Sequence, residues 1–130
     1  MSGDRARFVF EDDGAVFQGR RDDVGRRTLA DLRAGRVAVD REVDLHGLLA
    51  RDARRELLAE LADALRVGDR CLLVIHGAGH HSREGPVLRR KLPGWLMEGP
   101  RAGDLLAFAS APRKLGGPGA SLVLLRRVRS

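Results

Sequence analysis

Apolar and charged positions follow two different periods along this chain, and each period predicts a different element. Between Gly47 and Arg66 the apolar residues recur at helical spacing, with charged residues mainly on the other faces. The run Arg70 to Ile75 is almost continuously apolar, which is typical of a strand buried in a parallel sheet. Val37 to Leu45 alternates in part and predicts an earlier strand. Together these segments predict a strand–helix–strand unit, which commonly joins neighbouring parallel strands.

The second half of the chain predicts one more helix and two more strands. A helical pattern opens at Pro86 to Leu92, and Pro93 must end or kink it, although a short turn can restart beyond. Residues 105–109 and 121–127 are apolar runs that predict strands, and the glycine- and proline-rich stretch 112–119 predicts the loop between them. The predicted order is therefore β-α-β-α-β-β.

The N-terminal residues do not continue this pattern. Residues 1–22 mix aromatic side chains with acidic and basic clusters, a composition typical of a tail or adaptor. Asp22 to Ala34 predicts a short helix that ends at Gly35. A chain of 130 residues can hold one compact domain with a modest core. We therefore expect a partly helical arm over residues 1–36 and an α/β domain over residues 37–130.

All four histidines fall into two glycine-bearing stretches, residues 44–47 and residues 76–81. Each stretch follows a strand pattern and precedes a helical one. Parallel strands of an open α/β sheet deliver such loops to one edge, where ligands usually bind. Imidazole titrates nearest neutrality, which suits proton transfer and metal ligation. We therefore expect one shared active site at that edge.

The first stretch places a carboxylate two residues before a histidine. On an extended chain Asp44 and His46 point to the same side, so they could act as base and orienter or as metal ligands. In the alternative, Asp44 caps local backbone amides and His46 is simply exposed. His76 and His80 could join them as zinc ligands, but the chain lacks the close-spaced Cys/His pairs that indicate structural zinc.

The second stretch puts Gly77 and Gly79 between a strand and a helix, where free backbone N–H groups and the helix dipole attract an anion. It is not a Walker A loop, because no Gly-Lys-Ser/Thr follows. Ser82 stands where the dinucleotide fingerprint needs a third glycine. In the alternative, the glycines only allow a tight turn. His80 and His81 are adjacent and diverge, so we expect at most one of them to face the site.

The charge of the chain favours a polyanionic partner. The formal net charge is +6 and rests almost entirely on arginine, which suits RNA or DNA. A GC-rich genome would also produce this arginine bias. Tyrosine is absent and aromatic residues are scarce, which disfavours a base-stacking platform. Trp95 is most simply a core residue.

The single cysteine, Cys71, lies in an apolar run, and we expect a buried, inert thiol. With one cysteine no disulfide forms within the chain, which is consistent with a reducing cytoplasm. No N-terminal apolar stretch has the length of a signal peptide, and no run has transmembrane length. We expect a cytoplasmic protein without a membrane partner.

Taken in order, these segments resemble a small MutS-related (Smr) domain over roughly residues 40–128. Each motif is common by itself, and the order is what makes the resemblance specific. The chain is similar to the stand-alone bacterial form, with a basic arm and without the MutS-type ATPase. The motifs that carry the resemblance are Val43-Asp44-Leu45-His46-Gly47, Leu73 to Gly79, His81-Ser82, Val87-Leu88, Trp95-Leu96, Ala109 to Pro112 and Gly116 to Ala120.

The resemblance implies an α/β two-layer sandwich with a mixed four-stranded sheet, similar to the C-terminal domain of translation initiation factor three. It also implies nucleic-acid binding with endonuclease activity. The substrate would be DNA, by nicking, or RNA, including mRNA at stalled or collided ribosomes.

The family's Asp-x-His pair maps onto Asp44 and His46, and its His-Gly-x-Gly loop maps onto residues 76–79. This chain departs from the pattern at two positions. Ala78 replaces a residue that is often basic, which removes one expected phosphate contact. Leu49 stands where Ser or Thr commonly caps the first helix.

We therefore expect an endonuclease that cleaves RNA or nicks DNA. His46 or His76 would remove a proton from the attacking hydroxyl or water, while Asp44 orients an imidazole and favours its charged form. With RNA the attacker could be the substrate's own 2′-hydroxyl, which needs no metal. With DNA a water and a divalent ion such as Mg²⁺ or Mn²⁺ would be required. The groups expected to bind the phosphates are Gly77, Gly79, His81, Ser82, Arg83, Arg89, Arg90, Lys91, Arg113 and Lys114.

Two other functions stay open at this point. One is a non-catalytic nucleic-acid- or ribosome-binding module that uses the same basic face. The other is a protein-interaction domain for a repair or translation factor. Cleavage assays on RNA, DNA and stalled ribosomes separate the enzyme from both.

Overall fold

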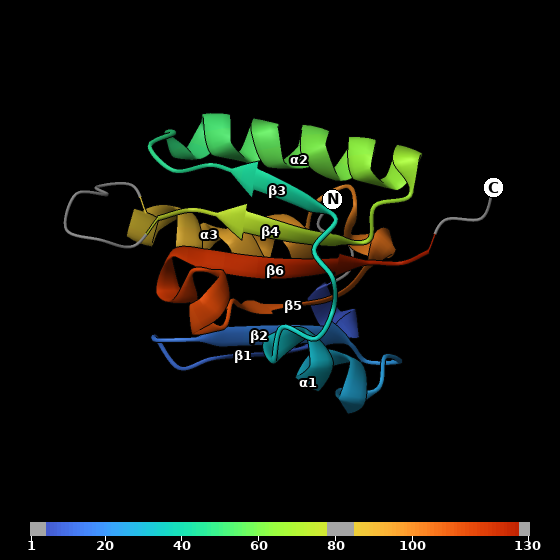
Figure 1. Ribbon diagram of the computed structural model, residues 1–130. Helices are drawn as coiled ribbons and strands as arrows, with labels where there is room; N and C mark the ends of the chain where they lie inside the picture. Colours follow the sequence, from blue (N-terminus) through green and yellow to red (C-terminus); the bar gives the residue numbers. More distant parts are fainter. Residues whose placement is uncertain (1–4, 78–84, 128–130) are drawn as a thin grey trace.

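The computed structural model describes residues 5–77 and 85–127, and in these ranges the chain forms one mixed six-stranded sheet with three α-helices (Figure 1). Short 3-10 turns fill several connections. None of the helices in these ranges is long and apolar enough to cross a membrane. The elements are β1 (Phe8–Asp12), β2 (Phe17–Arg21), α1 (Arg26–Arg33), β3 (Arg41–Asp44), α2 (Ala50–Val67), β4 (Cys71–Ile75), α3 (Gly85–Met97), β5 (Leu105–Ser110) and β6 (Ala120–Leu125).

The strand–helix–strand unit predicted from the sequence is present as β3, α2 and β4. The two strands are parallel neighbours, with Val43 opposite Val74 and Asp44 opposite Ile75. Strand β6 lies between β4 and β5 and is antiparallel to both, so the sheet order is β1-β2-β5-β6-β4-β3. The mixed α/β class and the four predicted strands are therefore confirmed.

Two further strands come from the N-terminal residues, where the composition indicated a tail. Strands β1 and β2 form an antiparallel hairpin, and β2 pairs with β5 at the edge of the sheet. Phe17 points into the core, and Gly19 lets the ring of Phe108 approach the backbone. A Cβ at position 19 would lie 2.5 Å from that ring. The hairpin thus has a packing partner that only the folded sheet provides.

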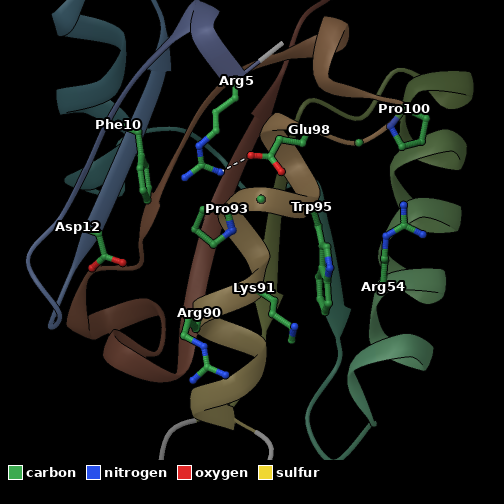
Figure 2. Close-up of a pocket in the computed structure, with 12 residues that line it drawn as sticks. Arg5, Phe10, Asp12, Arg54, Arg90, Lys91, Pro93, Trp95, Glu98 and Pro100 are labelled. Atoms are coloured by element: carbon green, nitrogen blue, oxygen red, sulfur yellow. Dashed lines mark hydrogen bonds and ion pairs between the residues drawn. The ribbon is translucent and has the colours of Figure 1, made fainter. Parts of the chain in front are cut away.

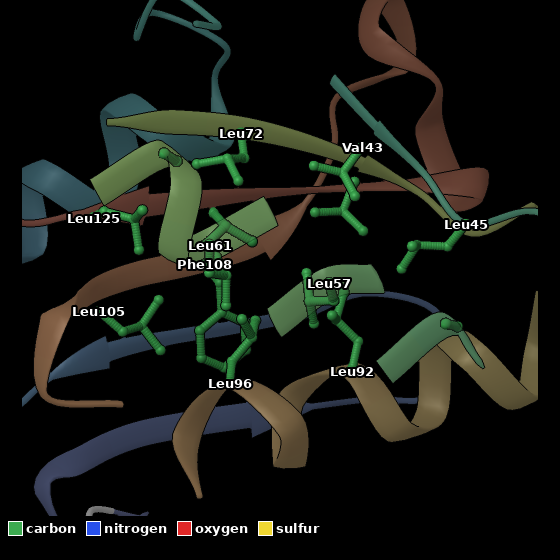
Figure 3. Close-up of a cluster of buried hydrophobic side chains, with 14 of the residues drawn as sticks. Val43, Leu45, Leu57, Leu61, Leu72, Leu92, Leu96, Leu105, Phe108 and Leu125 are labelled. Carbon is green, nitrogen blue, oxygen red and sulfur yellow. The ribbon is translucent and has the colours of Figure 1, made fainter. Parts of the chain in front are cut away.

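Helices α2 and α3 cover one face of the sheet and enclose the larger core cluster (Figure 3). Leu57 and Leu61 of α2 and Leu92 and Leu96 of α3 pack there with Phe108. Pro93, the ninth residue of α3, does not end the helix, which continues to Met97. The proline ring is itself buried in this layer, and its packing offsets the loss of the backbone hydrogen bond that proline cannot donate.

Helix α1 covers the opposite face of the sheet (Figure 1). Leu29 and Leu32 pack against a second cluster of small and apolar side chains, which includes Cys71 and Leu73. The N-terminal segment therefore adds a third layer to the expected two. The buried thiol predicted at Cys71 is confirmed, and burial raises its pKa to about 11.

Candidate catalytic edge

The carboxyl ends of β3 and β4 meet the start of β6 at one edge of the sheet. Backbone bonds hold these segments together. The N–H of Leu45 donates to Ile75 O at 2.7 Å, and the N–H groups of His76 and Gly77 both donate to Gly119 O, at 3.0 and 2.9 Å. The predicted convergence of the two histidine stretches therefore holds for the backbone of their described residues, 44–47 and 76–77.

Asp44 and His46 form an exposed pair at this edge. Asp44 Oδ1 lies 2.5 Å from His46 Nδ1 and also accepts the backbone N–H of His46 at 3.1 Å. The carboxylate of Asp44 thus makes both predicted interactions: it orients the imidazole of His46, and it caps a backbone amide. Because a carboxylate accepts, Nδ1 carries the proton and Nε2 keeps its lone pair. The bond from the imidazole holds the pKa of Asp44 below its usual value.

Both side chains of the pair are open to solvent, with 54% of Asp44 and 66% of His46 exposed. Gly47 follows in a left-handed conformation, with φ of +80°, and turns the chain toward α2. Leu49 occupies the N-cap of α2 without a side-chain bond, so the missing Ser or Thr cap is not replaced by another side chain. An exposed imidazole with a free Nε2 can take a proton from a bound substrate.

His76 has a different environment, because only 1% of it is exposed. Its Nε2 lies 2.9 Å from Ser121 Oγ, and its Nδ1 lies 3.3 Å from Gly77 O. Burial, and secondarily the charge of Arg89, holds the pKa of His76 below its ordinary value. The imidazole is therefore a neutral, hydrogen-bonded core group.

The side chains of His76 and Asp44 point to opposite faces of the sheet. Ser121 and Val123 lie two residues apart on β6 and therefore share a face. Val123 belongs to the core cluster under α2 and α3, so the imidazole of His76, which contacts Ser121, lies on that face. On β3 it is Val43 that belongs to this cluster, and Asp44 therefore points away from it. Although β3 and β4 are neighbours, the Asp44–His46 pair is exposed to solvent, whereas the imidazole of His76 is buried.

The phosphate-binding expectations have mixed outcomes. Gly77 adopts φ of +87°, as a tight turn requires, but its N–H donates to Gly119 O and is therefore not free to bind an anion. The remaining predicted groups of the loop, Gly79, His81, Ser82 and Arg83, lie outside the described residues. Within the described part, the alternative of glycine as a turn residue fits position 77.

Arg89 is engaged inside the fold. Its guanidinium bonds Asp12 at 3.2 Å and lies 4.8 Å from the centre of the Phe17 ring, with 17% of the side chain exposed. It ties α3 to the N-terminal hairpin, and its predicted role in phosphate binding stays a prediction. Arg90 and Lys91 are exposed on α3, and Arg113 and Lys114 are exposed in the turn before β6.

Sequence reasoning missed Ser121 and two arginines. Ser121 is a lone polar residue in the apolar strand β6, a signal that could have indicated a buried partner. Arg5 and Arg54 line a basic groove over α3. Because they lie far apart in the sequence, their proximity could not be predicted from it. Among the described residues no group of three His, Cys, Asp or Glu side chains is placed to hold a metal ion.

Comparison with known proteins gives a consistent family. The Smr domain model matches residues 43–126, well over half of the chain. Ribosome rescue factor SmrB of Aliivibrio fischeri (strain MJ11) is 38% identical over 117 residues, which is 90% of this chain and 61% of the relative. Its counterpart in Vibrio vulnificus (strain CMCP6) is 41% identical over 105 residues, or 81% of this chain and 55% of the relative. The chain thus spans less than two thirds of these curated relatives.

Solved structures agree with this match. YdaL, a stand-alone small MutS-related protein from Escherichia coli, has a TM-score of 0.71 at 28% identity, covering 85% of this chain and 82% of its own. The Smr domain of Thermus thermophilus MutS2 has a TM-score of 0.57 at 34% identity, covering 66% of this chain and 98% of that domain. This chain belongs to the Smr domain family, as the order of its motifs predicts.

Proposed function

We propose that this chain is an Smr-type endonuclease that cuts RNA, with Asp44 and His46 as its catalytic pair. The observation that carries the proposal is the 2.5 Å contact between Asp44 Oδ1 and His46 Nδ1 in an exposed strand-end turn. The carboxylate fixes the imidazole and stabilises its charged form, and it leaves Nε2 to act on substrate. This is the arrangement that general-base catalysis requires.

On RNA, His46 Nε2 removes the proton of a 2′-hydroxyl. The 2′-oxygen then forms a bond to the adjacent phosphorus, while the bond from phosphorus to the 5′-oxygen breaks. The leaving 5′-oxygen takes a proton from solvent, and His46 returns its own proton to water. The products are a 2′,3′-cyclic phosphate and a free 5′-hydroxyl. Asp44 stabilises the imidazolium throughout and changes no bond itself.

Ribosome-bound mRNA is the substrate we favour. The relatives in the family bear the name ribosome rescue factor, and this chain matches them over 90% of its own length. RNA also supplies the nucleophile, whereas DNA would need a water and, in general, a divalent ion. DNA nicking therefore serves as the comparison arm of the assay.

His76 is best interpreted as a positioning residue. Its imidazole is enclosed and paired with Ser121, and its backbone N–H binds the Gly119 carbonyl. It therefore holds the end of β4 against the start of β6.

A non-catalytic nucleic-acid- or ribosome-binding module is the second candidate. The enclosure of His76 favours it, because among the described residues His46 is then the one histidine exposed at this edge. A binding module would retain affinity for RNA without turnover.

Incubation with labelled single-stranded RNA, circular DNA and stalled ribosomes, with and without EDTA, distinguishes these functions. The proposal requires cleavage of RNA that resists EDTA and is lost in Asp44→Asn. Binding without cleavage on every substrate would establish the second candidate.

A further inference from the structure

A groove of about 800 Å³ runs over α3, between the N-terminal hairpin and α2 (Figure 2). It lies beyond the Asp44–His46 pair and none of the steps above uses it. Its walls come from β1, α2 and α3, so segments far apart in the sequence build it together. The lining residues that concern us are Arg5, Phe10, Arg54, Arg90, Lys91 and Trp95.

The groove has a positive charge that the fold leaves unneutralised. Its two carboxylates are both engaged: Glu98 lies 2.6 Å from Arg5, and Asp12 lies 3.2 Å from Arg89. In contrast, Arg54, Arg90 and Lys91 are exposed, and no carboxylate of the described residues pairs with them. Unpaired cations along a concave surface favour a polyanion.

Trp95 adds an aromatic surface to these cations. It packs against the core cluster under α3 as a partly buried side chain, and Lys91 precedes it by one helical turn. Figure 2 shows the indole in the space between α3 and α2, with Lys91 and Arg54 on either side. The scarcity of aromatic residues argued against a stacking platform, but one indole set between cations suffices to stack a base beside its phosphates.

Helix α2 begins shortly after His46, and Figure 1 shows the start of α3 on the side of the sheet where β3 and β4 end. The groove therefore runs along two helices that begin toward the candidate catalytic edge. With a rise of about 1.5 Å per residue, Trp95 lies roughly 15 Å along α3 from its first residue. That length corresponds to roughly four nucleotides at about 3.4 Å each.

We propose that this groove binds a single-stranded stretch of nucleic acid next to the cut, with phosphates on Arg54, Arg90 and Lys91 and a base stacked on Trp95. The inference rests on the proposed function only in assigning the cut to the Asp44–His46 edge. A duplex keeps its bases stacked on one another, so only an unpaired strand can offer a base to the indole.

The chain carries its own probe for this site, because it contains one tryptophan and no tyrosine. Trp95 fluorescence therefore reports the groove without a label. The experiment titrates the Asp44→Asn variant with oligouridylate and with oligodeoxythymidylate of roughly ten nucleotides. We expect both to quench Trp95, and a stronger effect of the RNA arm would indicate recognition of the 2′-hydroxyl.

Helices α3 and α1 each carry two adjacent, exposed cations, so one double variant on each helix gives a test and its matched control. Arg90→Gln/Lys91→Gln removes charge from the groove, and Arg26→Gln/Arg27→Gln removes the same charge from α1 on the other face. We expect the groove variant to reduce the log–log salt slope of binding by about 1.4, at roughly 0.7 per phosphate on single strands. The α1 variant should leave slope and quenching unchanged.

Trp95→Leu tests the stacked base by anisotropy of a labelled oligonucleotide. The loss of one stacked base should weaken binding by about fivefold to more than a hundredfold, while Trp95→Phe retains most of the affinity. A melting curve for each variant confirms that it is folded.

Three results would overturn the inference: binding that leaves Trp95 fluorescence unchanged, equal losses in the groove and α1 variants, or equal quenching by polyglutamate. None of them concerns cleavage. A chain that cuts RNA normally without using the groove refutes this inference alone, and one that binds in the groove without cutting refutes only the catalytic proposal.

Discussion

Replacing His76 with alanine separates a positioning role from direct catalysis. The imidazole is enclosed and bonds Ser121 Oγ at 2.9 Å. Its loss leaves the serine hydroxyl without its acceptor, at a cost of about 1–3 kcal/mol. The cavity left in a close-packed core adds a further cost of about 1–2 kcal/mol. We therefore expect His76→Ala to lower the free energy of unfolding by roughly 2–5 kcal/mol, a large part of the 5–15 kcal/mol of an average domain.

Urea denaturation followed by circular dichroism measures this loss, and a double-mutant cycle with Ser121→Ala measures the coupling of the two side chains. We expect a coupling of about 0.5–3 kcal/mol, as for residues in contact. RNA cleavage is then measured at a temperature where wild type and variant are both folded. A stable variant with the full unfolding free energy but no activity would refute the positioning role and restore direct proton transfer by His76.

The pH dependence gives an independent test of the same residue. The folded-state pKa of His76 lies below its ordinary value of 6.5, so the unfolded chain binds the proton first as the pH falls. His76 therefore contributes full stability above about pH 6.5, and this contribution is lost progressively as the pH falls toward the folded pKa. The His76→Ala variant should lose less stability over that range than wild type. Identical pH slopes for the two proteins would contradict a buried neutral imidazole.

Three smaller predictions concern the scaffold. Cys71 should resist thiol reagents in the native protein and react once urea unfolds it, because burial raises its pKa to about 11; fast labelling of folded protein would disprove this. Gly19→Ala should cost about 1–3 kcal/mol in urea denaturation, since the new Cβ meets the Phe108 ring at 2.5 Å, and an unchanged midpoint would argue against the packed hairpin. Arg41→Met removes the guanidinium that contacts three carboxylates, each within 2.9 Å: Glu60, Asp63 and Asp69. We expect the free energy of unfolding to fall by about 1–3 kcal/mol for this partly exposed cluster. An unchanged free energy of unfolding would show that the cluster does not stabilise the fold.

The sequence predicted the parts of the fold that depend on local periodicity. The buried run at 71–75, the helix after Gly47 and the meeting of residues 44–47 with residues 76–77 at one edge were all predictable from the sequence. The N-terminal hairpin was not, because β1 and β2 carry charge on their exposed positions and gain their apolar contacts from segments far along the chain, such as β5. Pattern alone cannot supply a packing partner from the far end of the chain.

The site shows the same limit at the level of single residues. Sequence placed His76 and Gly77 at the strand end, but not the Ser121 hydroxyl and Gly119 carbonyl that engage them from a later segment. Arg89 was indistinguishable from its neighbour Arg90 until Asp12 appeared beside it. Polar groups that lie in the core must find partners, and those partners are set by tertiary structure.

The cleavage rates of wild type, Asp44→Asn and His46→Gln on RNA test whether Asp44 and His46 are the catalytic pair. Both side chains are exposed, so the variants should unfold within about 0.5 kcal/mol of wild type and bind RNA as well. General acid–base catalysis contributes about 10²–10⁴-fold, and we predict a loss of that size in each variant, together with 2′,3′-cyclic phosphate ends on the wild-type products. If either variant cleaves at the wild-type rate, the substituted residue is not catalytic.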